Sequence, residues 1–322
     1  MRTGVFCLVI VFIMGSLSAA AGAEGYLYGQ NTSVFGTIMT HAIENENESL
    51  IELARKFDLG YNEIVDANPG LDPFVPGSGK AVIIPSSWIM PDVQVYDGIV
   101  INISELRLYY FFSQGGRPQV MTFPIGIGDE GTETPLGSYR IIEKIINPAW
   151  HVPESIRKEH PELPAVVPAG PDNPMGSHAL RLSLPSILIH GTNRPWCVGR
   201  MASHGCIRLY PEDIPKLFRM VSKDAPVTIV SQPVKIGVRE GKVYIELHMD
   251  NGINSEACLK MAIALLVKKH LLGQVSSVKL FNALHDKRGF PVEISEDTAE
   301  SGTSGGKSHG DSLPHKNLIL SL

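Results

Sequence analysis

The residues best suited to covalent chemistry gather at 189–210, which read I-H-G-T-N-R-P-W-C-V-G-R-M-A-S-H-G-C-I-R-L-Y. Cys206 closes a tight S-H-G-C turn, and the glycine before it lets the backbone bend sharply and leaves amide N–H groups unpaired. A thiolate in such a turn is a nucleophile, and free amides beside it can stabilise an oxyanion. The amides of Gly205 and Cys206 are therefore the predicted oxyanion donors.

A histidine brought beside the thiol would hold it as the thiolate, which is the reactive form. His204 lies two positions before Cys206 in the same turn, where successive side chains tend to diverge. His190 ends a strand-like run, L-P-S-I-L-I, and can present its ring across the site. The residue types alone leave either histidine as the base.

Three further side chains are candidate substrate contacts. Arg208 follows the thiol by two residues and can hold a carboxylate with a bidentate hydrogen bond. His204 can contact the substrate if it is not the base. The Ser203 hydroxyl most simply stabilises the turn, and we count it with this group because it adjoins the nucleophile.

Two alternatives compete with nucleophilic catalysis. A cysteine with two satisfied histidines is a common buried arrangement without any activity. A zinc ion held by His190, His204 and Cys206 would make a hydrolytic site. The stretch has no nearby carboxylate to act as a general base, and its spacing fits no common zinc pattern, so we predict neither a metal nor a cofactor.

The pattern H-G-T-N-x-P-W-x-V-G-R-x-x-S-H-G-C-I-R resembles the signature of the L,D-transpeptidases, with the YkuD-type catalytic domain, in their ErfK/YbiS/YcfS/YnhG branch. The turn T-P-L-G-S-Y at 134–139 also matches that family. The resemblance implies that Cys206 is the nucleophile and His190 the base. The Gly191 carbonyl would orient the base in place of the usual carboxylate, and His204 would be a secondary contact.

The same resemblance implies a periplasmic enzyme that acts on peptidoglycan stem peptides. The donor would be a tetrapeptide stem, cleaved after the L-centre of its diamino acid with release of D-alanine. The acceptor would be a second stem, giving a 3→3 cross-link, or a lysine of an outer-membrane lipoprotein, which we prefer slightly. Carbapenems would acylate the cysteine. An L,D-carboxypeptidase and a non-catalytic peptidoglycan-binding protein remain the alternatives.

Length, charge and the N-terminus set the broader limits. The chain has 322 residues and a formal net charge of −5, which does not favour nucleic-acid binding. Residues 1–23 read as a signal peptide, with Arg2, an apolar run too short to span a bilayer, and a small-residue site ending at Ala23. No later run predicts a membrane span. Removal of Cys7 leaves Cys197, Cys206 and Cys258, an odd number that predicts a free thiol.

The 31 glycines and 23 prolines favour a mainly β fold, and the resemblance implies a β-sandwich catalytic domain. The residues at 48–57 and 61–67 predict two helices, and those at 81–84 predict a strand. This order resembles a LysM-type module. Seven prolines between Pro148 and Pro174 predict an irregular flap over the site. The chain is predicted to begin with a signal peptide (1–23), a lead-in (24–39) and the LysM-like module (40–90), which ends in a linker near 85–91. The catalytic domain (97–231), a small α/β subdomain (232–294) and a disordered tail (295–322) follow.

Overall fold

The computed structural model describes residues 25–29, 32–248 and 253–297, and its elements contain more strand than helix. The catalytic region holds one sheet of nine strands. In spatial order these are β1 (Tyr26–Leu27), β8 (Arg117–Pro124), β7 (Arg107–Gln114), β6 (Gly98–Asn102), β17 (Pro226–Val230), β10 (Gly137–Ile146), β13 (His178–Leu182), β14 (Leu188–His190) and β16 (Ile207–Arg208).

The long strand β10 divides this sheet into two halves. Its first part, from Gly137 to Arg140, pairs with β17. Its second part pairs with β13, after a register shift between Ile141 and Glu143. The predicted β-sandwich therefore differs from the structure in one respect: its two faces belong to a single sheet that bends within β10.

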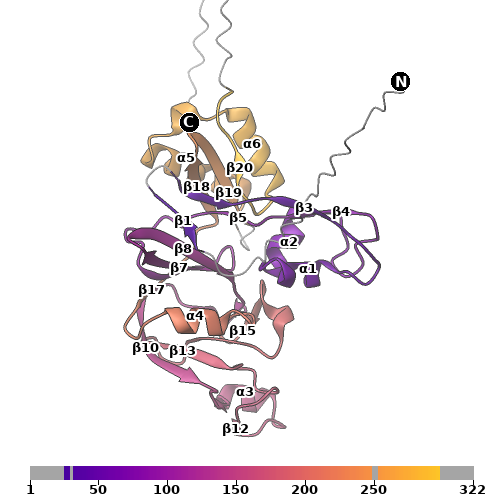
Figure 1. Ribbon diagram of the computed structural model, residues 1–322, viewed down its shortest axis with the longest axis vertical. Coiled ribbons are helices and arrows are strands. Elements are labelled where there is room, and N and C mark those ends of the chain that lie inside the picture. The colour runs from indigo at the N-terminus through magenta and orange to yellow at the C-terminus, as the bar shows by residue number, and fades with distance from the viewer. Residues whose placement is uncertain (1–24, 30–31, 249–252, 298–322) are drawn as a thin grey trace, which may run out of the picture.

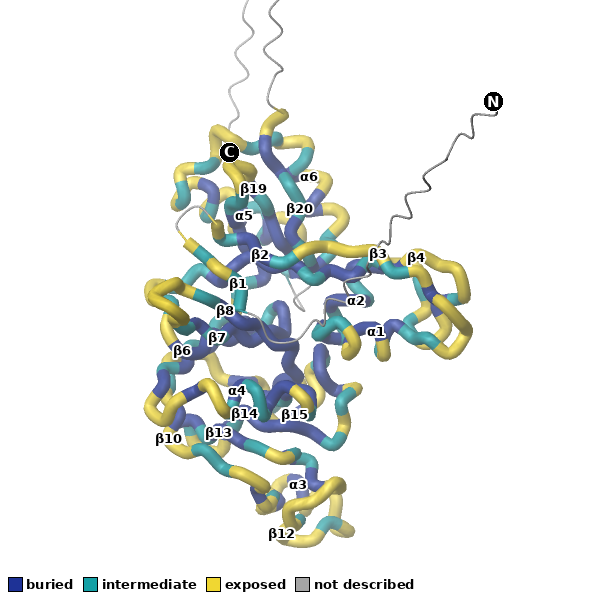
Figure 2. The backbone as a smooth tube through the Cα atoms, viewed as in Figure 1, coloured by how far each residue is buried: buried dark blue, intermediate teal, exposed yellow. Residues whose placement is uncertain are grey.

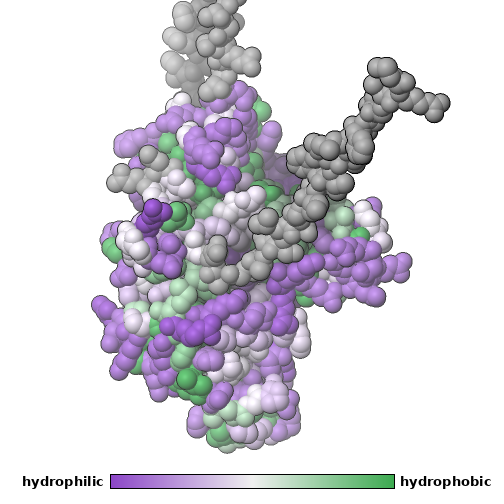
Figure 3. Space-filling model, in the orientation of Figure 1, coloured by the Kyte–Doolittle hydropathy of each residue, from purple (hydrophilic) through white to green (hydrophobic). Residues whose placement is uncertain are grey.

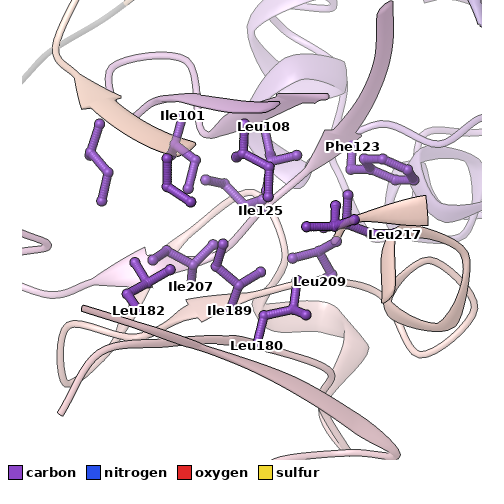
Figure 4. Close-up of a cluster of buried hydrophobic side chains, with 14 of the residues drawn as sticks. Ile101, Leu108, Phe123, Ile125, Leu180, Leu182, Ile189, Ile207, Leu209 and Leu217 are labelled. Atoms are coloured by element: carbon purple, nitrogen blue, oxygen red, sulfur yellow. The ribbon is translucent and has the colours of Figure 1, made fainter. Parts of the chain in front are cut away.

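Apolar side chains from the two halves meet in the core. Figure 4 shows Ile101 and Leu108 of one half above Leu182, Ile189 and Leu180 of the other. All five are at most 1% exposed. Burying such side chains is the main favourable term in folding, at roughly 1.5–3 kcal/mol for each. This core fixes the strands that carry the site.

The N-terminal module has the order strand, helix, helix, strand. Strand β3 (Met39–Ala42) pairs with β4 (Ala81–Ile84), and α1 (Leu50–Lys56) and α2 (Tyr61–Ala67) lie between them in the chain. A capping box of Ser49 and Glu52 begins α1. Both predicted helices and the predicted strand at 81–84 are present. Glycan binding by this module stays a prediction.

The lead-in at 24–39 and the linker at 85–91 contain strands that the sequence did not predict. Strand β1 extends the nine-stranded sheet, while β2 (Val34–Gly36) pairs with β5 (Ser87–Ile89). Phe35, Trp88 and Ile89 are buried there. Strands of two or three residues are too short to show an alternating pattern, which explains the difference.

The C-terminal subdomain packs two helices on a three-stranded sheet. Its elements are β18 (Val234–Arg239), β19 (Lys242–Leu247), α5 (Ser255–Lys268), the 3₁₀ turn Leu272–Gln274, α6 (Ser277–Asp286) and β20 (Val292–Glu293). The hairpin turns at Glu240 and Gly241, as predicted. Ser295 is buried and accepts a hydrogen bond from the Val243 amide, so this residue does not belong to a disordered tail as predicted for 295–322. The predicted signal peptide and residues 298–322 lie outside the described residues.

Figure 1 shows the subdomain at one end of the molecule, the catalytic region at the centre and other end, and the N-terminal module alongside. Buried ion pairs join these parts. Figure 2 marks buried residues in dark blue along β7 and α2. Arg107 of β7 bonds Glu63 of α2, and its guanidinium lies 4.2 Å from the centre of the Trp88 ring. Lys235 of β18 contacts Glu105, in the β6–β7 turn. The three parts are therefore joined by buried contacts between their side chains.

Hydrophilic residues cover most of the face in Figure 3, with hydrophobic ones in small separate groups. Within the described ranges, no helix has the length and apolar character needed to cross a membrane.

Candidate active site

Strands β14 and β16 set the face on which the candidate residues lie. They run parallel, with Ile189 opposite Ile207 and His190 opposite Arg208. Alternate residues of a strand point to opposite faces. Ile189 and Ile207 are fully buried in the core, so His190, Arg208 and the preceding Cys206 belong to the other face. The sequence prediction that these three come together is met at the level of the backbone.

His190 is 3% exposed and its Nδ1 donates to the Gly191 carbonyl at 2.6 Å. Burial lowers the pKa of His190 to about 4, helped by the nearby charge of Arg208 and opposed by hydrogen bonds to the Gly191 and Met175 carbonyls. The ring is therefore neutral near pH 7. A neutral imidazole whose Nδ1 carries the proton has its other nitrogen available as a base.

Cys206 is half-buried, and its Sγ lies 3.5 Å from the carbonyl oxygen of Ser186. Burial raises the pKa of this thiol, against the Leu188 amide and the charges of Arg208 and Arg181, which lower it. Within the described residues the thiol makes no hydrogen bond with His190. The resting thiol is thus neutral, whereas the sequence predicted a thiolate; the cause is the low polarity of its surroundings.

The S-H-G-C turn is held by hydrogen bonds to its carbonyls. Ser203 Oγ donates to the Cys206 carbonyl at 2.6 Å, and Thr134 Oγ1 to that of Gly205 at 2.9 Å. Gly205 has φ +94°, in the left-handed region that favours glycine. Ser203 is 3% exposed and bonded within the turn, which agrees with the expected turn-stabilising hydroxyl, and contact with the substrate stays a prediction.

The amides of Gly205 and Cys206 donate to no acceptor in the described part of the chain. They adjoin the thiol, as an oxyanion site requires. Arg208 Nη1 donates to the Ala202 carbonyl at 2.8 Å, while its Nη2 makes no hydrogen bond and its buried Nε has no partner within the described ranges. Arg208 therefore keeps donors that a substrate carboxylate could use.

His204 is exposed, and its Nε2 lies 4.0 Å from Glu159 Oε2 of α3 (Glu154–Glu159). The zinc alternative required the ligand atoms of His190, His204 and Cys206 to converge. In the described ranges, ligand atoms converge within 4.8 Å only at Glu105, Glu246 and His248. Lys235 Nζ already lies among those groups.

The proline-rich segment at 147–176 is anchored at its base. It contains β11 (Trp150–His151), α3 and β12 (Val166–Val167). The buried Asn173 amide donates to the carbonyls of Pro148 and Pro168 at 2.8 and 3.0 Å. Gly176, with φ +67°, packs so closely on Gly191 that a Cβ would lie 2.9 Å from its Cα. Coverage of the substrate by this segment stays a prediction.

The loop between the two histidines is held by the N-terminal module, a contact that sequence reasoning missed. The Tyr61 amide donates to the Val198 carbonyl at 3.2 Å. A Cβ on Gly199 would lie 2.1 Å from the Tyr61 nitrogen. The Arg200 guanidinium stacks 3.5 Å from the centre of the Tyr61 ring. Nothing in the local pattern signals such a contact, since it joins residues far apart in the chain.

Cys197 and Cys258 are free buried thiols. Cys197 Sγ lies 3.7 Å from Thr192 Oγ1, whereas Cys258 belongs to the core of the C-terminal subdomain. The sequence left their pairing open, and the structure leaves both unpaired.

Residues 96–229 match the YkuD family, described as the L,D-transpeptidase catalytic domain. Over 217 residues the chain is 42% identical to the probable L,D-transpeptidase YcfS of Escherichia coli, covering 65% of this chain and 67% of that protein. It is 35% identical to the probable L,D-transpeptidase ErfK/SrfK of Salmonella typhimurium, over 83% of this chain and 89% of that protein. It is 34% identical to the probable L,D-transpeptidase YbiS of E. coli, over 88% of this chain and 95% of that protein.

Proposed function

This chain belongs to the L,D-transpeptidase family, an enzyme family that acts on peptidoglycan, and on that basis we propose that Cys206 and His190 carry the acyl transfer. The main support is the neutral His190, fixed through Nδ1 by the Gly191 carbonyl on the sheet face that also bears Cys206. The proposed donor is a tetrapeptide stem, and the proposed site of action is the periplasm.

In the first half-reaction the Cys206 thiol leaves the Ser186 carbonyl and passes its proton to the free nitrogen of His190. The thiolate attacks the carbonyl at the L-centre of the diamino acid, and the amides of Gly205 and Cys206 stabilise the oxyanion. The C–N bond then breaks, and the His190 proton goes to the departing D-alanine nitrogen. A thioester on Cys206 remains.

In the second half-reaction an acceptor amine attacks the thioester. His190 takes the proton that the amine loses, the C–S bond breaks, and His190 passes that proton to the Cys206 sulfur. Arg208 is proposed to hold a donor carboxylate, because it lies beside both His190 and Cys206 and its Nη2 makes no hydrogen bond within the described residues. An arginine fork suits a carboxylate better than a lysine would.

For the acceptor we favour slightly the lysine of an outer-membrane lipoprotein over a second stem. The support is the segment at 147–176, which is anchored beside Gly191 and is long enough to frame a groove for a peptide tail. His204, near Glu159 of that segment, would contact the entering acceptor.

The test is to incubate the purified enzyme with a tetrapeptide muropeptide and, separately, a second muropeptide or a lysine-ended lipoprotein tail, and to identify products by mass spectrometry. Thioester formation on wild-type enzyme and none on the folded Cys206→Ala variant would support the mechanism. A 3→3 dimer without a tail adduct would overturn the acceptor preference, and free tripeptide alone would indicate the carboxypeptidase. Lack of acylation by muropeptide or a carbapenem would favour a binding protein.

A further inference from the structure

The face of the sheet that bears Cys206 also carries an arginine that the site described above does not use. Leu188 pairs with Arg181 across β14 and β13, and Arg181 pairs with Glu143 across β13 and β10. The register of β14 and β16 sets Cys206 level with Leu188. These four residues therefore form one row across four strands, on the face opposite the core.

The distances within this row suit a contact with a substrate held at the thiol. Neighbouring strands lie about 4.8 Å apart, so the backbones of Arg181 and Cys206 are separated by about 10 Å. A long substrate side chain held at the thiol can span that gap by passing over Leu188 and so reach Arg181 beside Glu143. The charge of Arg181 indeed acts on the Cys206 thiol, since it lowers the pKa of that group against the effect of burial.

The guanidinium of Arg181 is oriented but not saturated. Its Nε donates to Glu143 Oε2 at 2.7 Å. Its two terminal nitrogens make no hydrogen bond within the described residues, and the side chain is 41% exposed. Because a guanidinium offers five N–H donors in a fixed fork, the pair with Glu143 leaves an edge free for a second carboxylate.

We propose that Arg181 binds a second carboxylate, carried at the far end of the donor's diamino acid side chain, and so selects donors in which that group is unmodified. This assignment rests on the proposed function, because it needs the diamino acid carbonyl to sit at Cys206. Arg208 adjoins the thiol along its own strand and suits a carboxylate close to the scissile bond. Arg181 lies two strands away and suits one at the end of a side chain.

The experiment compares two tetrapeptide donors that differ only in this group, one with the free carboxylate and one with its carboxamide. Acylation of Cys206 is followed by intact-protein mass and D-alanine release, for wild type, Arg181→Gln, Arg181→Lys and Arg140→Gln. Arg140 is an exposed arginine of β10 bonded to the Asp224 carbonyl, outside the row, and serves as the matched control. Circular dichroism and thermal unfolding check that each variant folds.

Wild type and Arg140→Gln should prefer the free carboxylate by at least about tenfold in kcat/KM, as a charge-assisted hydrogen bond implies. Arg181→Gln should lose that preference by slowing only on the free acid. Arg181→Lys should keep only part of it, since an ammonium cannot form the fork. An equal loss on both donors, or an unchanged preference in Arg181→Gln, would overturn the assignment while the proposed function stands. No acylation of wild type by either donor would overturn both.

Discussion

The Sγ atom of Cys206 lies 3.5 Å from the carbonyl oxygen of Ser186 and donates its hydrogen bond there rather than to the ring of His190. A carbonyl accepts from a neutral S–H but repels a thiolate. Ser186 is held at φ +66°, an unusual conformation for a residue other than glycine. The thiol of the free enzyme is therefore kept protonated, and it meets its base only after it turns away from Ser186.

The first prediction concerns the pH dependence of thiol reactivity. Burial raises the pKa of Cys206, so at a given pH the free enzyme holds less thiolate than an ordinary cysteine. Alkylation by iodoacetamide, followed by intact-protein mass, should reach half its maximal rate above the ordinary thiol value of about 8.5. The Cys206→Ala variant is the control, because any alkylation of it must occur at the buried thiols of Cys197 and Cys258. A half-maximal rate below pH 7 would contradict this, because it would indicate a thiolate paired with imidazolium.

The second prediction separates the two histidines. His190→Ala should lower kcat/KM by roughly 10²–10⁴-fold, the usual contribution of a general base. His204→Ala should have a much smaller effect, because that ring is exposed and lies 4.0 Å from its nearest carboxylate. The rates of D-alanine release by the two variants show which substitution lowers activity more. If His204→Ala were the more damaging change, the assignment of the base would be wrong.

The third prediction tests the contact between the N-terminal module and the catalytic loop. Gly199→Ala would place a Cβ 2.1 Å from the Tyr61 nitrogen, so the loop or helix α2 must move and both activity and stability should fall. Gly241→Ala is the matched control, since φ is +77° there, against +79° at Gly199, and its Cβ would meet open space. It should cost only about 1–2 kcal/mol. Urea unfolding and kcat/KM measure both; equal effects would mean that the contact is unimportant.

The fourth prediction concerns the buried charges between the catalytic region and the C-terminal subdomain. Lys235→Met would leave Glu105 and Glu246 without their shared cation, and should lower the free energy of unfolding by about 3–5 kcal/mol. Lys242→Met, which removes an exposed pair with Glu293, should lower the free energy of unfolding far less, because water and salt screen that pair. Chemical denaturation compares the two variants. Similar small losses in both would show that the buried cluster adds little to stability.

The sequence by itself determined the family and much of the local structure. The S-H-G-C turn required a glycine before the cysteine, and Gly205 indeed has φ +94°. The helices of the N-terminal module and the hairpin of the C-terminal subdomain were predictable, because periodic apolar residues and turn residues act over a few positions. The family followed from the long motif between the two histidines.

Only the tertiary structure decided the states of those groups and their distant partners. The protonation of His190 and Cys206 depends on how much water the surrounding fold excludes, which no local pattern records. The Gly199–Tyr61 contact joins residues far apart in the chain, and the row containing Arg181 exists only through strand register. Strand pairing is set by packing across the whole sheet, so a sequence read in short windows cannot specify it.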